Sequence, residues 1–309
     1  MADFQANTRP FAELDRAGRT RRLRRLAEAA LTAYDVPVAR LTPLAHGLNT
    51  TFRIDGADGH RYVLRVQRPD GPGTARVRSE MAWLAALRRE TDLVVPLPVP
   101  TRERDLVTVV ADPAVPEPRT CVLCHWVDGR FVDERLSAPQ LYAVGEFAAR
   151  LHLHGARMNG LDRGRVDDLT EFGRTQVDGL SAAVVERAVA LAGGDERIRE
   201  AVARARAVRA ELGCGSDVFG LVHGDLRQVN YLFHRGRVRA IDFDDCGFGH
   251  YAYDLAVALD ELKHLPQRHE LREALLDGYR SVRPDAATTD PAVLNAFAGL
   301  RRVQLRLRT

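Results

Sequence analysis

Two carboxylates and one amide around residue 230 have the types and the spacing to carry out chemistry. Asn230 follows Asp225 after five residues, and Asp242 follows Asn230 after twelve. Phosphoryl transfer uses such a set, because one carboxylate orients the attacking hydroxyl while two oxygen ligands hold Mg²⁺ on the nucleotide phosphates. The three side chains therefore predict a phosphoryl-transfer site.

Short apolar runs predict the buried strands that must position these residues. The runs lie at residues 218–222, 231–233 and 240–241. Arg235-Gly236 predicts a tight turn between the last two runs, which would then form a hairpin. Pairing in that hairpin would bring Asn230 and Asp242 close together in space.

The spacing of Asp225 and Asn230 matches the catalytic loop of the protein-kinase signature, with Asp242-Phe243 where the metal-binding aspartate is expected. A single Asp or Asn in a loop is more often a turn or cap residue, because its side chain bonds to nearby backbone. The prediction therefore depends on the whole arrangement and on the order of the elements upstream.

Length and composition are those of a chain with two separate cores. The chain has 309 residues, of which 45% are hydrophobic, and its formal net charge of +3 indicates no strong field for nucleic acid. Only Lys263 is a lysine among 45 basic residues, so the other 44 are arginines. A Walker-type phosphate loop is thereby excluded, and any cation that grips phosphate in the first half must be an arginine.

Neither a signal peptide nor a run of eighteen apolar residues is present, so we predict a cytoplasmic protein with no membrane partner. Four cysteines predict no disulfide framework in a chain of this length. Cys121, Cys124 and His125 fit the haem-attachment pattern of c-type cytochromes, but they lie in an apolar run at 120–127. We interpret these cysteines as buried and structural.

A second candidate site lies in the first half of the chain. Residues 45–54 and 61–66 around a Gly-Ala-Asp-Gly turn at 56–59 predict a hairpin, whose polar bend could offer donors to phosphate. Arg65 lies in the middle of the second strand, and Glu80 opens a predicted helix at 79–89. An ion pair between them would hold the guanidinium ready to clamp nucleotide phosphates. The alternative is an exposed Arg and a Glu that the helix dipole favours.

The remaining pattern predicts a β-rich first part and a helical second part. Strands are expected at 105–110 and 120–127, the second ending in Asp128-Gly129, where a hinge would place adenine against the backbone of residues 123–126. Apolar residues recur at helical spacing at 16–34, 141–152, 180–212, 253–262, 271–280 and 292–307. The first of these helices is arginine-rich and expected to be solvated, and Gly193-Gly194 is expected to break the segment 180–212 in two.

The chain resembles the aminoglycoside phosphotransferase and choline-kinase-like family, the small-molecule relatives of protein kinases. The residues that carry this resemblance run from about 40 to 262 and include segments 62–66, 79–84, 122–129, 148–152, 222–233 and 241–256. Within the family, the segment 241–256 is similar to the branch of homoserine kinase type II-like and stress-response kinase-like proteins. The resemblance implies an α+β, two-lobed kinase-like fold, with a small antiparallel-β lobe over 1–124 and a mainly helical lobe over 125–309.

The resemblance also implies a role for each matching residue. Asp225 would be the catalytic base, and Asn230 and Asp242 would bind Mg²⁺. The nucleotide, ATP or GTP, would be bound by Arg65, Glu80, Leu123, His125 and Trp126. His223 and Asp254 would brace the catalytic loop. Two positions depart from the usual pattern: Arg227 replaces a common His, and Arg65 replaces the Lys of protein kinases, with a different geometry.

The implied activity is transfer of the γ-phosphate to a hydroxyl of a small molecule, such as an aminoglycoside-type antibiotic, homoserine or an amino alcohol. A cationic acceptor could be received by the candidate acidic residues Asp244, Asp245, Asp260 and Glu261, and by the acidic stretch 162–171. Two alternatives stay open: a protein Ser/Thr kinase of the stress-response type, and a catalytically silent nucleotide-binding module. The oligomer is expected to be a monomer or a homodimer, and relatives often continue beyond Thr309, which leaves truncation open.

Overall fold

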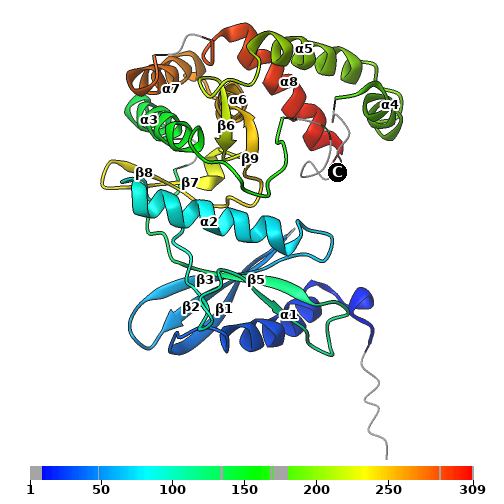
Figure 1. Ribbon diagram of the computed structural model, residues 1–309, viewed down its shortest axis with the longest axis vertical. Helices are drawn as coiled ribbons and strands as arrows, with labels where there is room; N and C mark the ends of the chain where they lie inside the picture. The colour runs from blue at the N-terminus through cyan, green and yellow to red at the C-terminus, as the bar shows by residue number, and fades with distance from the viewer. Residues whose placement is uncertain are drawn as a thin grey trace, which may run out of the picture. The chain divides into compact units, whose positions relative to one another are not determined.

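The computed structural model (Figure 1) describes residues 9–47, 49–132, 135–167, 169, 180–284 and 287–307. The chain forms two compact units, one of Met1–Ala85 and Pro96–Trp126, the other of Ala86–Val95 and Val127–Thr309. The boundary predicted from the sequence is instead a single one, between 124 and 125. The segment 86–95 joins the second unit because its backbone pairs there, with Ala240 N donating to Val94 O at 3.2 Å.

The first unit is built on an antiparallel five-stranded sheet in the order β1-β2-β3-β5-β4. The strands are β1 (Val38–His46), β2 (Thr50–Gly56), β3 (Arg61–Val66), β4 (Thr108–Val110) and β5 (Arg119–His125). The predicted hairpin around the turn at 56–59 is confirmed, with β2 paired to β3, but residues 45–54 do not form one strand. A bend at Gly47 and Asn49 separates β1 from β2, and Gly47 N donates to Asn49 O at 3.0 Å.

Helix α1 (Arg16–Leu31) covers one face of this sheet and supplies a third of the buried core residues. Its apolar stripe of Leu23, Leu26 and Leu31 packs against Phe52 and Leu64 of the sheet. Each buried leucine contributes about 1.5–3 kcal/mol. Asp15 caps the helix by accepting from Gly18 N at 2.7 Å. Helix α2 (Thr74–Glu90) follows β3 and carries Glu80.

The predicted strand at 105–110 is shorter than expected. The carboxylate of Asp105 accepts from the backbone N–H groups of Leu106 and Val107, at 2.7 and 3.4 Å. These bonds form a local turn, which is the use that Asp side chains have in loops. Only Thr108–Val110 therefore enters the sheet as β4.

Cysteines 121 and 124 lie on β5, and both are buried, as predicted. Burial raises the pKa of each thiol to about 12, so neither is ionised at neutral pH. Cys246 is also buried, whereas Cys214 is exposed.

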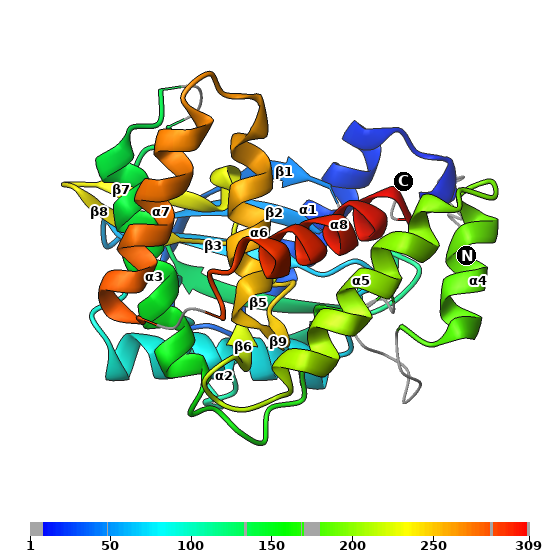
Figure 2. The ribbon, with the colours of Figure 1, turned by 90° about the horizontal axis from the view of Figure 1, so that it is seen from above.

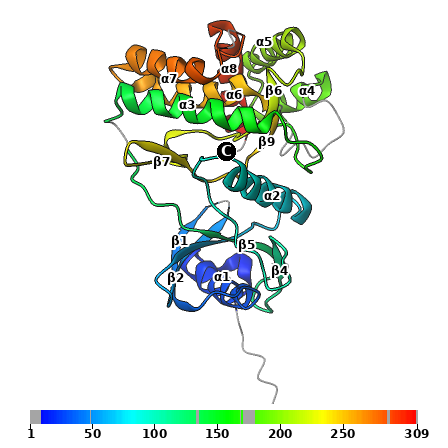
Figure 3. The same cartoon turned by 60° about the vertical axis from the view of Figure 1, so that its left-hand side comes forward.

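The second unit consists mainly of helices. They are α3 (Ala138–Gly155), α4 (Ala182–Leu191), α5 (Arg197–Leu212), α6 (Tyr251–Glu261), α7 (Arg268–Val282) and α8 (Pro291–Leu307). The predicted break at Gly193-Gly194 is confirmed, since both glycines have a positive φ and end α4. Helices α3 and α7 lie side by side in Figure 3 and approach closely, because a Cβ on Gly145 would lie 2.0 Å from Leu275 O.

Two short antiparallel pairs complete this unit: β6 (Phe219–Val222) with β9 (Gly247–His250), and β7 (Tyr231–His234) with β8 (Arg237–Ala240). Figure 2 shows α8 running alongside α5 and α6, with which it makes its main contacts. This α+β arrangement confirms the predicted fold class. Over the part of the chain that the structure describes, no helix has both the length and the apolar character needed to cross a membrane.

Candidate active site

The hairpin β7–β8 brings Asn230 and Asp242 to the same end of two paired strands. Tyr231 pairs with Ala240, and the turn is made by Arg235 and Gly236, both with positive φ. Beyond the last strand pair, Ile241 N donates to Asn230 O at 2.8 Å. The predicted hairpin is thus confirmed, and residues twelve apart in sequence become neighbours.

Asp225 is held at both of its carboxylate oxygens. Asn230 Nδ2 donates to Asp225 Oδ2 and to Asp225 O, each at 2.9 Å, and Arg301 of α8 forms an ion pair with Oδ1. Burial raises the pKa of Asp225, and this effect exceeds the opposing effect of Arg301, while the nearby Asp245 raises the pKa further. A carboxylate with a raised pKa and a fixed orientation is suited to accept a proton.

The loop that carries Asp225 is braced by the buried carboxylate of Asp254. His223 N and Gly224 N donate to the two oxygens of Asp254, both at 2.8 Å, and His152 donates from Nε2 at 3.1 Å. Burial alone would raise the pKa of Asp254, but these bonds together lower it, so the carboxylate stays ionised. A Cβ on Gly224, whose φ is +83°, would lie 2.3 Å from Asp245 O.

The same loop is tied to the residue before Asp242. His223 Nε2 donates to Ile241 O at 3.0 Å, and the His223 ring packs against Phe243 with centroids 4.3 Å apart. Asp242 itself is exposed and has a φ of +64°, a strained conformation for a residue other than glycine. The loop and the end of the hairpin are thus built as one piece.

Asn230 and Asp242 have the chemistry of ligands for a hard cation. The bonds of Asn230 Nδ2 leave its Oδ1 facing away from Asp225, and within the described residues neither Oδ1 nor the Asp242 carboxylate has a hydrogen bond or ion pair. No group of three or more His, Cys, Asp or Glu side chains forms a metal site among those residues. Two oxygen ligands fit a Mg²⁺ that takes its other ligands from phosphate and water.

In the first unit, Arg65 and Glu80 come together as an ion pair, with Arg65 Nη2 2.6 Å from Glu80 Oε2. Arg65 is fixed mid-sheet between Thr51 on β2 and Val122 on β5. With its amide oxygen turned toward Arg65, the buried Gln67 accepts from Arg65 Nε at 2.9 Å. The guanidinium therefore has one orientation relative to the sheet.

The three residues expected near adenine differ in their surroundings. Leu123 is buried in the core opposite Leu64, and its carbonyl accepts from Val99 N at 2.8 Å. His125 N and Trp126 N also donate to backbone carbonyls within the unit. The guanidinium groups of Arg53 and Arg61 lie 5.6 and 5.4 Å from the centre of the Trp126 ring. These backbone groups are therefore occupied, and adenine binding here stays a prediction.

The candidate acceptor residues fall into two kinds. Asp244 and Asp245 are half-buried in the turn after Asp242, and Asp245 is close enough to raise the pKa of Asp225. Asp260, by contrast, binds Arg302 and Lys263 at 2.7 and 2.9 Å, and Glu261 is exposed on the last turn of α6. Of the acidic stretch 162–171, Asp168 and Glu171 lie outside the described residues. Asp244 and Asp245 are therefore the better placed pair.

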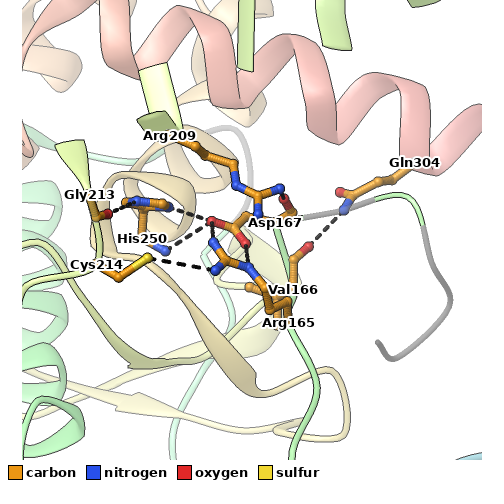
Figure 4. A network of polar contacts seen from close by, with 8 residues as sticks. All are labelled: Arg165, Val166, Asp167, Arg209, Gly213, Cys214, His250 and Gln304. Carbon is orange, nitrogen blue, oxygen red and sulfur yellow. Dashed lines mark hydrogen bonds and ion pairs between the residues drawn. The ribbon is translucent and has the colours of Figure 1, made fainter. Parts of the chain in front are cut away.

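A buried polar network that the sequence analysis missed adjoins this turn (Figure 4). Asp167 accepts from His250 Nδ1 at 2.5 Å and from Arg165 Nε at 2.9 Å. Burial opposes ionisation of Asp167, but His250 and Arg165 lower its pKa to about 2. Arg163, in the same segment, donates to Asp244 O at 2.7 Å and to Cys246 O at 2.5 Å, so the segment 163–167 anchors the turn that follows Asp242.

Arg301 is the other residue that sequence reasoning missed. It lies in a helix whose buried stripe contains Leu294, Phe297 and Leu300, and it occupies a buried position beside them. An arginine at a position where the helical period calls for an apolar residue is itself a signal, since an unpaired buried charge is costly. That signal identifies a paired arginine but not its partner.

Comparison with known proteins identifies the family to which the chain belongs. The model of the phosphotransferase enzyme family matches residues 40–293. The chain is 33% identical to a microcompartment-associated aminopropanol kinase of known structure, covering 92% of this chain and 88% of that one, with a TM-score of 0.69. It is also 30% identical to an uncharacterised protein of Deinococcus radiodurans over 89% of this chain and 78% of that protein.

A second solved structure has a similar fold at lower identity. It is an amicoumacin kinase in complex with AMP-PNP, Ca²⁺ and Ami, 20% identical over 96% of this chain and 90% of that one, with a TM-score of 0.72. The family match spans both units and includes the predicted site residues from Arg65 to Asp254. The chain belongs to the phosphotransferase enzyme family and is a small-molecule O-phosphotransferase with a kinase-like fold.

Proposed function

We propose that this protein transfers the γ-phosphoryl group of ATP, with Mg²⁺, to the hydroxyl of a small amino alcohol of the aminopropanol type. The observation that carries the reaction is the Asp225 carboxylate, held at both oxygens beside Asn230 and within the loop tied to Asp242. The observation that carries the substrate class is the 33% identity to an aminopropanol kinase over 92% of the chain.

Asn230 Oδ1 and the Asp242 carboxylate would hold Mg²⁺, which when bound neutralises charge on the nucleotide phosphates. The amicoumacin kinase of similar fold binds AMP-PNP with a divalent cation, which supports a nucleotide–metal complex in this chain as well. Arg65, fixed by Glu80, would bind the nucleotide phosphates.

Asp225 would accept a hydrogen bond from the acceptor hydroxyl and hold it for attack. As the new O–P bond forms and the bond to the leaving ADP breaks, the hydroxyl proton passes to the Asp225 carboxylate and then to water. The raised pKa of Asp225 makes its carboxylate a stronger base for this step.

An ammonium group on the acceptor would be recognised by the half-buried Asp244 and Asp245, which follow the metal-binding residue directly. In this arrangement the distance between the hydroxyl and the amine decides which amino alcohols fit. An alcohol without an amine gains no ion pair and should bind more weakly, because charge-assisted hydrogen bonds are among the stronger ones.

The test is a screen of ATP and GTP consumption with Mg²⁺, using 1-amino-2-propanol, ethanolamine, homoserine, choline, kanamycin and amicoumacin A as acceptors. Mass spectrometry identifies the phosphorylated product, and 1,2-propanediol is the matched acceptor without the amine. We expect turnover with an amino alcohol and at least a tenfold lower kcat/KM with the diol. Turnover with kanamycin or amicoumacin alone, or equal rates with amine and diol, would contradict the proposed acceptor class.

A protein kinase and a catalytically silent nucleotide-binding module are the two alternatives to a small-molecule kinase. Labelling of a generic protein substrate by [γ-³²P]ATP, without turnover of any small alcohol, would indicate a protein kinase. A nucleotide-dependent rise in melting temperature without any turnover would indicate a binding module.

A further inference from the structure

Arg301 is a buried cation that reaches the candidate catalytic carboxylate from the far end of the sequence. It lies on α8, 76 residues after Asp225, and its side chain is almost fully buried. Its Nη2 donates to Asp225 Oδ1, and its Nη1 donates to the Tyr253 hydroxyl at 3.3 Å. Each end of the guanidinium fork therefore has a partner.

The partners of Arg301 are themselves held in place. The Tyr253 hydroxyl donates to Gln304 Oε1 at 2.6 Å, and Gln304 Nε2 donates to Val166 O at 2.7 Å. Figure 4 shows this last contact where α8 meets the network of Asp167, His250 and Arg165. Arg301 is thus fixed by α6 and α8 and by the segment that anchors the turn after Asp242.

The two members of the Arg301–Asp225 pair differ in their exposure to solvent. The side chain of Asp225 is 17% exposed to solvent, against 5% for that of Arg301. Asn230 fixes one oxygen of Asp225 and Arg301 fixes the other, so the carboxylate plane has a single orientation, and only its outer lone pairs can meet an incoming hydroxyl. Proton acceptance and attack depend on such alignment, and a displacement of about 1 Å can cost on the order of 100-fold in rate.

Stability alone does not account for this arrangement. A buried ion pair is often no more stabilising than apolar side chains of the same volume, because both charges must leave water. The neighbouring positions on the buried stripe are apolar, and an apolar residue would continue that stripe. A buried arginine whose main charged partner is the candidate base is better explained by orientation of that base.

We propose that Arg301 is a positioning residue for phosphoryl transfer, which fixes the Asp225 carboxylate toward the acceptor hydroxyl without touching the acceptor. This inference rests on the proposed function in requiring an acceptor hydroxyl at Asp225. It adds that α8, the last helix of the described chain, is part of the catalytic apparatus.

The kinetic test compares Arg301→Met, Arg301→Lys and the control Arg306→Met, each in the full chain with 1-amino-2-propanol, ATP and Mg²⁺. Arg306 lies on the same helix but is exposed and pairs with Asp195. We expect Arg301→Met to lower kcat about 100-fold with less than a threefold change in either KM. Arg301→Lys should recover at least tenfold of that loss, and the control should stay within twofold of wild type.

Some kinetic results would overturn the proposal while leaving the reaction class intact. These are an Arg301→Met variant with wild-type kcat, a loss confined to the acceptor KM, and a Lys variant no better than Met. Failure of the wild-type protein to phosphorylate 1-amino-2-propanol would count against the proposed acceptor instead, and is therefore distinguishable.

A second measurement needs no acceptor and covers a variant that is unstable. Melting temperatures are compared for Arg301→Met, Asp225→Asn and the double variant. Each single change leaves a buried or half-buried charge without its partner, whereas the double change removes both charges. The double variant should therefore melt above Arg301→Met, and simple addition of the two losses would overturn the pairing on which the proposal depends.

Discussion

Each of the two units contains an arginine–carboxylate pair among the candidate site residues, and the two pairs differ in which member is the more exposed. In the first unit the side chain of Glu80 is 1% exposed and that of Arg65 11%. In the second unit the side chain of Arg301 is 5% exposed and that of Asp225 17%. The outward member is therefore a cation in one unit and a carboxylate in the other.

This reversal matches the ligand that each pair is proposed to bind. A cation that faces outward suits nucleotide phosphates, whereas an outward carboxylate suits a hydroxyl that must lose its proton. In both pairs the inner partner lies on a helix, Glu80 on α2 and Arg301 on α8, and bonds to the outer group. An arginine and a carboxylate would thus serve either as a phosphate clamp or as a base, depending on which of them the fold buries.

The largest effect is expected when the outward carboxylate is neutralised. Asp225→Asn keeps the size of the side chain but cannot take the proton, so kcat should fall about 1,000-fold or more. Nucleotide binding should be unchanged, since the phosphate contacts lie elsewhere. Steady-state kinetics measures kcat, and a nucleotide-dependent melting shift measures nucleotide binding. A variant that keeps its turnover would show that Asp225 does not take part in the reaction.

The outward cation is tested by Arg65→Met. We expect kcat/KM for ATP to fall about 100-fold, with the acceptor KM changed less than threefold, because the clamp acts on phosphate alone. Glu80→Gln should give a smaller loss of the same kind, since Arg65 is retained but loses its charged partner. Equal increases in the KM for ATP and the KM for the acceptor would show that the pair does not act as a nucleotide clamp.

A third arginine–carboxylate pair, Arg165–Asp167, predicts a pH dependence of stability. Here the carboxylate is fully buried, and bonds from His250 and Arg165 lower its pKa to about 2, whereas burial raises the pKa of Asp225. A depressed folded-state pKa adds stability above the unfolded value near 4, which is lost as pH falls toward 2. Urea titrations across this pH range should show that the free energy of unfolding falls by about 2 kcal/mol. Asp167→Asn should remove this pH-dependent part.

The smallest effect is expected for a pair whose two members are both exposed. Arg24 and Glu28 lie one turn apart on α1 at 3.0 Å. Arg24→Ala should change the free energy of unfolding by less than about 0.5 kcal/mol, since solvent and salt screen such pairs. Urea unfolding at low and high salt measures this change, and a loss above 1 kcal/mol would mean that burial is not what separates the two pairs of the candidate site from surface pairs.

Local sequence determined the parts of the site that lie within one supersecondary element. The apolar runs around Arg235-Gly236 predict the hairpin that joins Asn230 to Asp242, and strand pairing makes this contact a consequence of register. Arg65 and Glu80 lie only 15 residues apart on a strand and the following helix, so their order in the chain also indicates their meeting. Both contacts depend on short-range geometry that residue types encode.

Tertiary packing alone decided the partners that come from distant segments. Arg301 meets Asp225 across 76 residues, and Asp167 meets His250 across 83, because α8 and the segment 163–167 pack against the loop and the strand that carry these residues. The buried arginine signals that a partner exists, since an unpaired charge in the core is costly, but many carboxylates could satisfy it. Residue types and spacing therefore predicted the reaction class and the candidate metal ligands, whereas the packing of helices decided which cation pairs with Asp225.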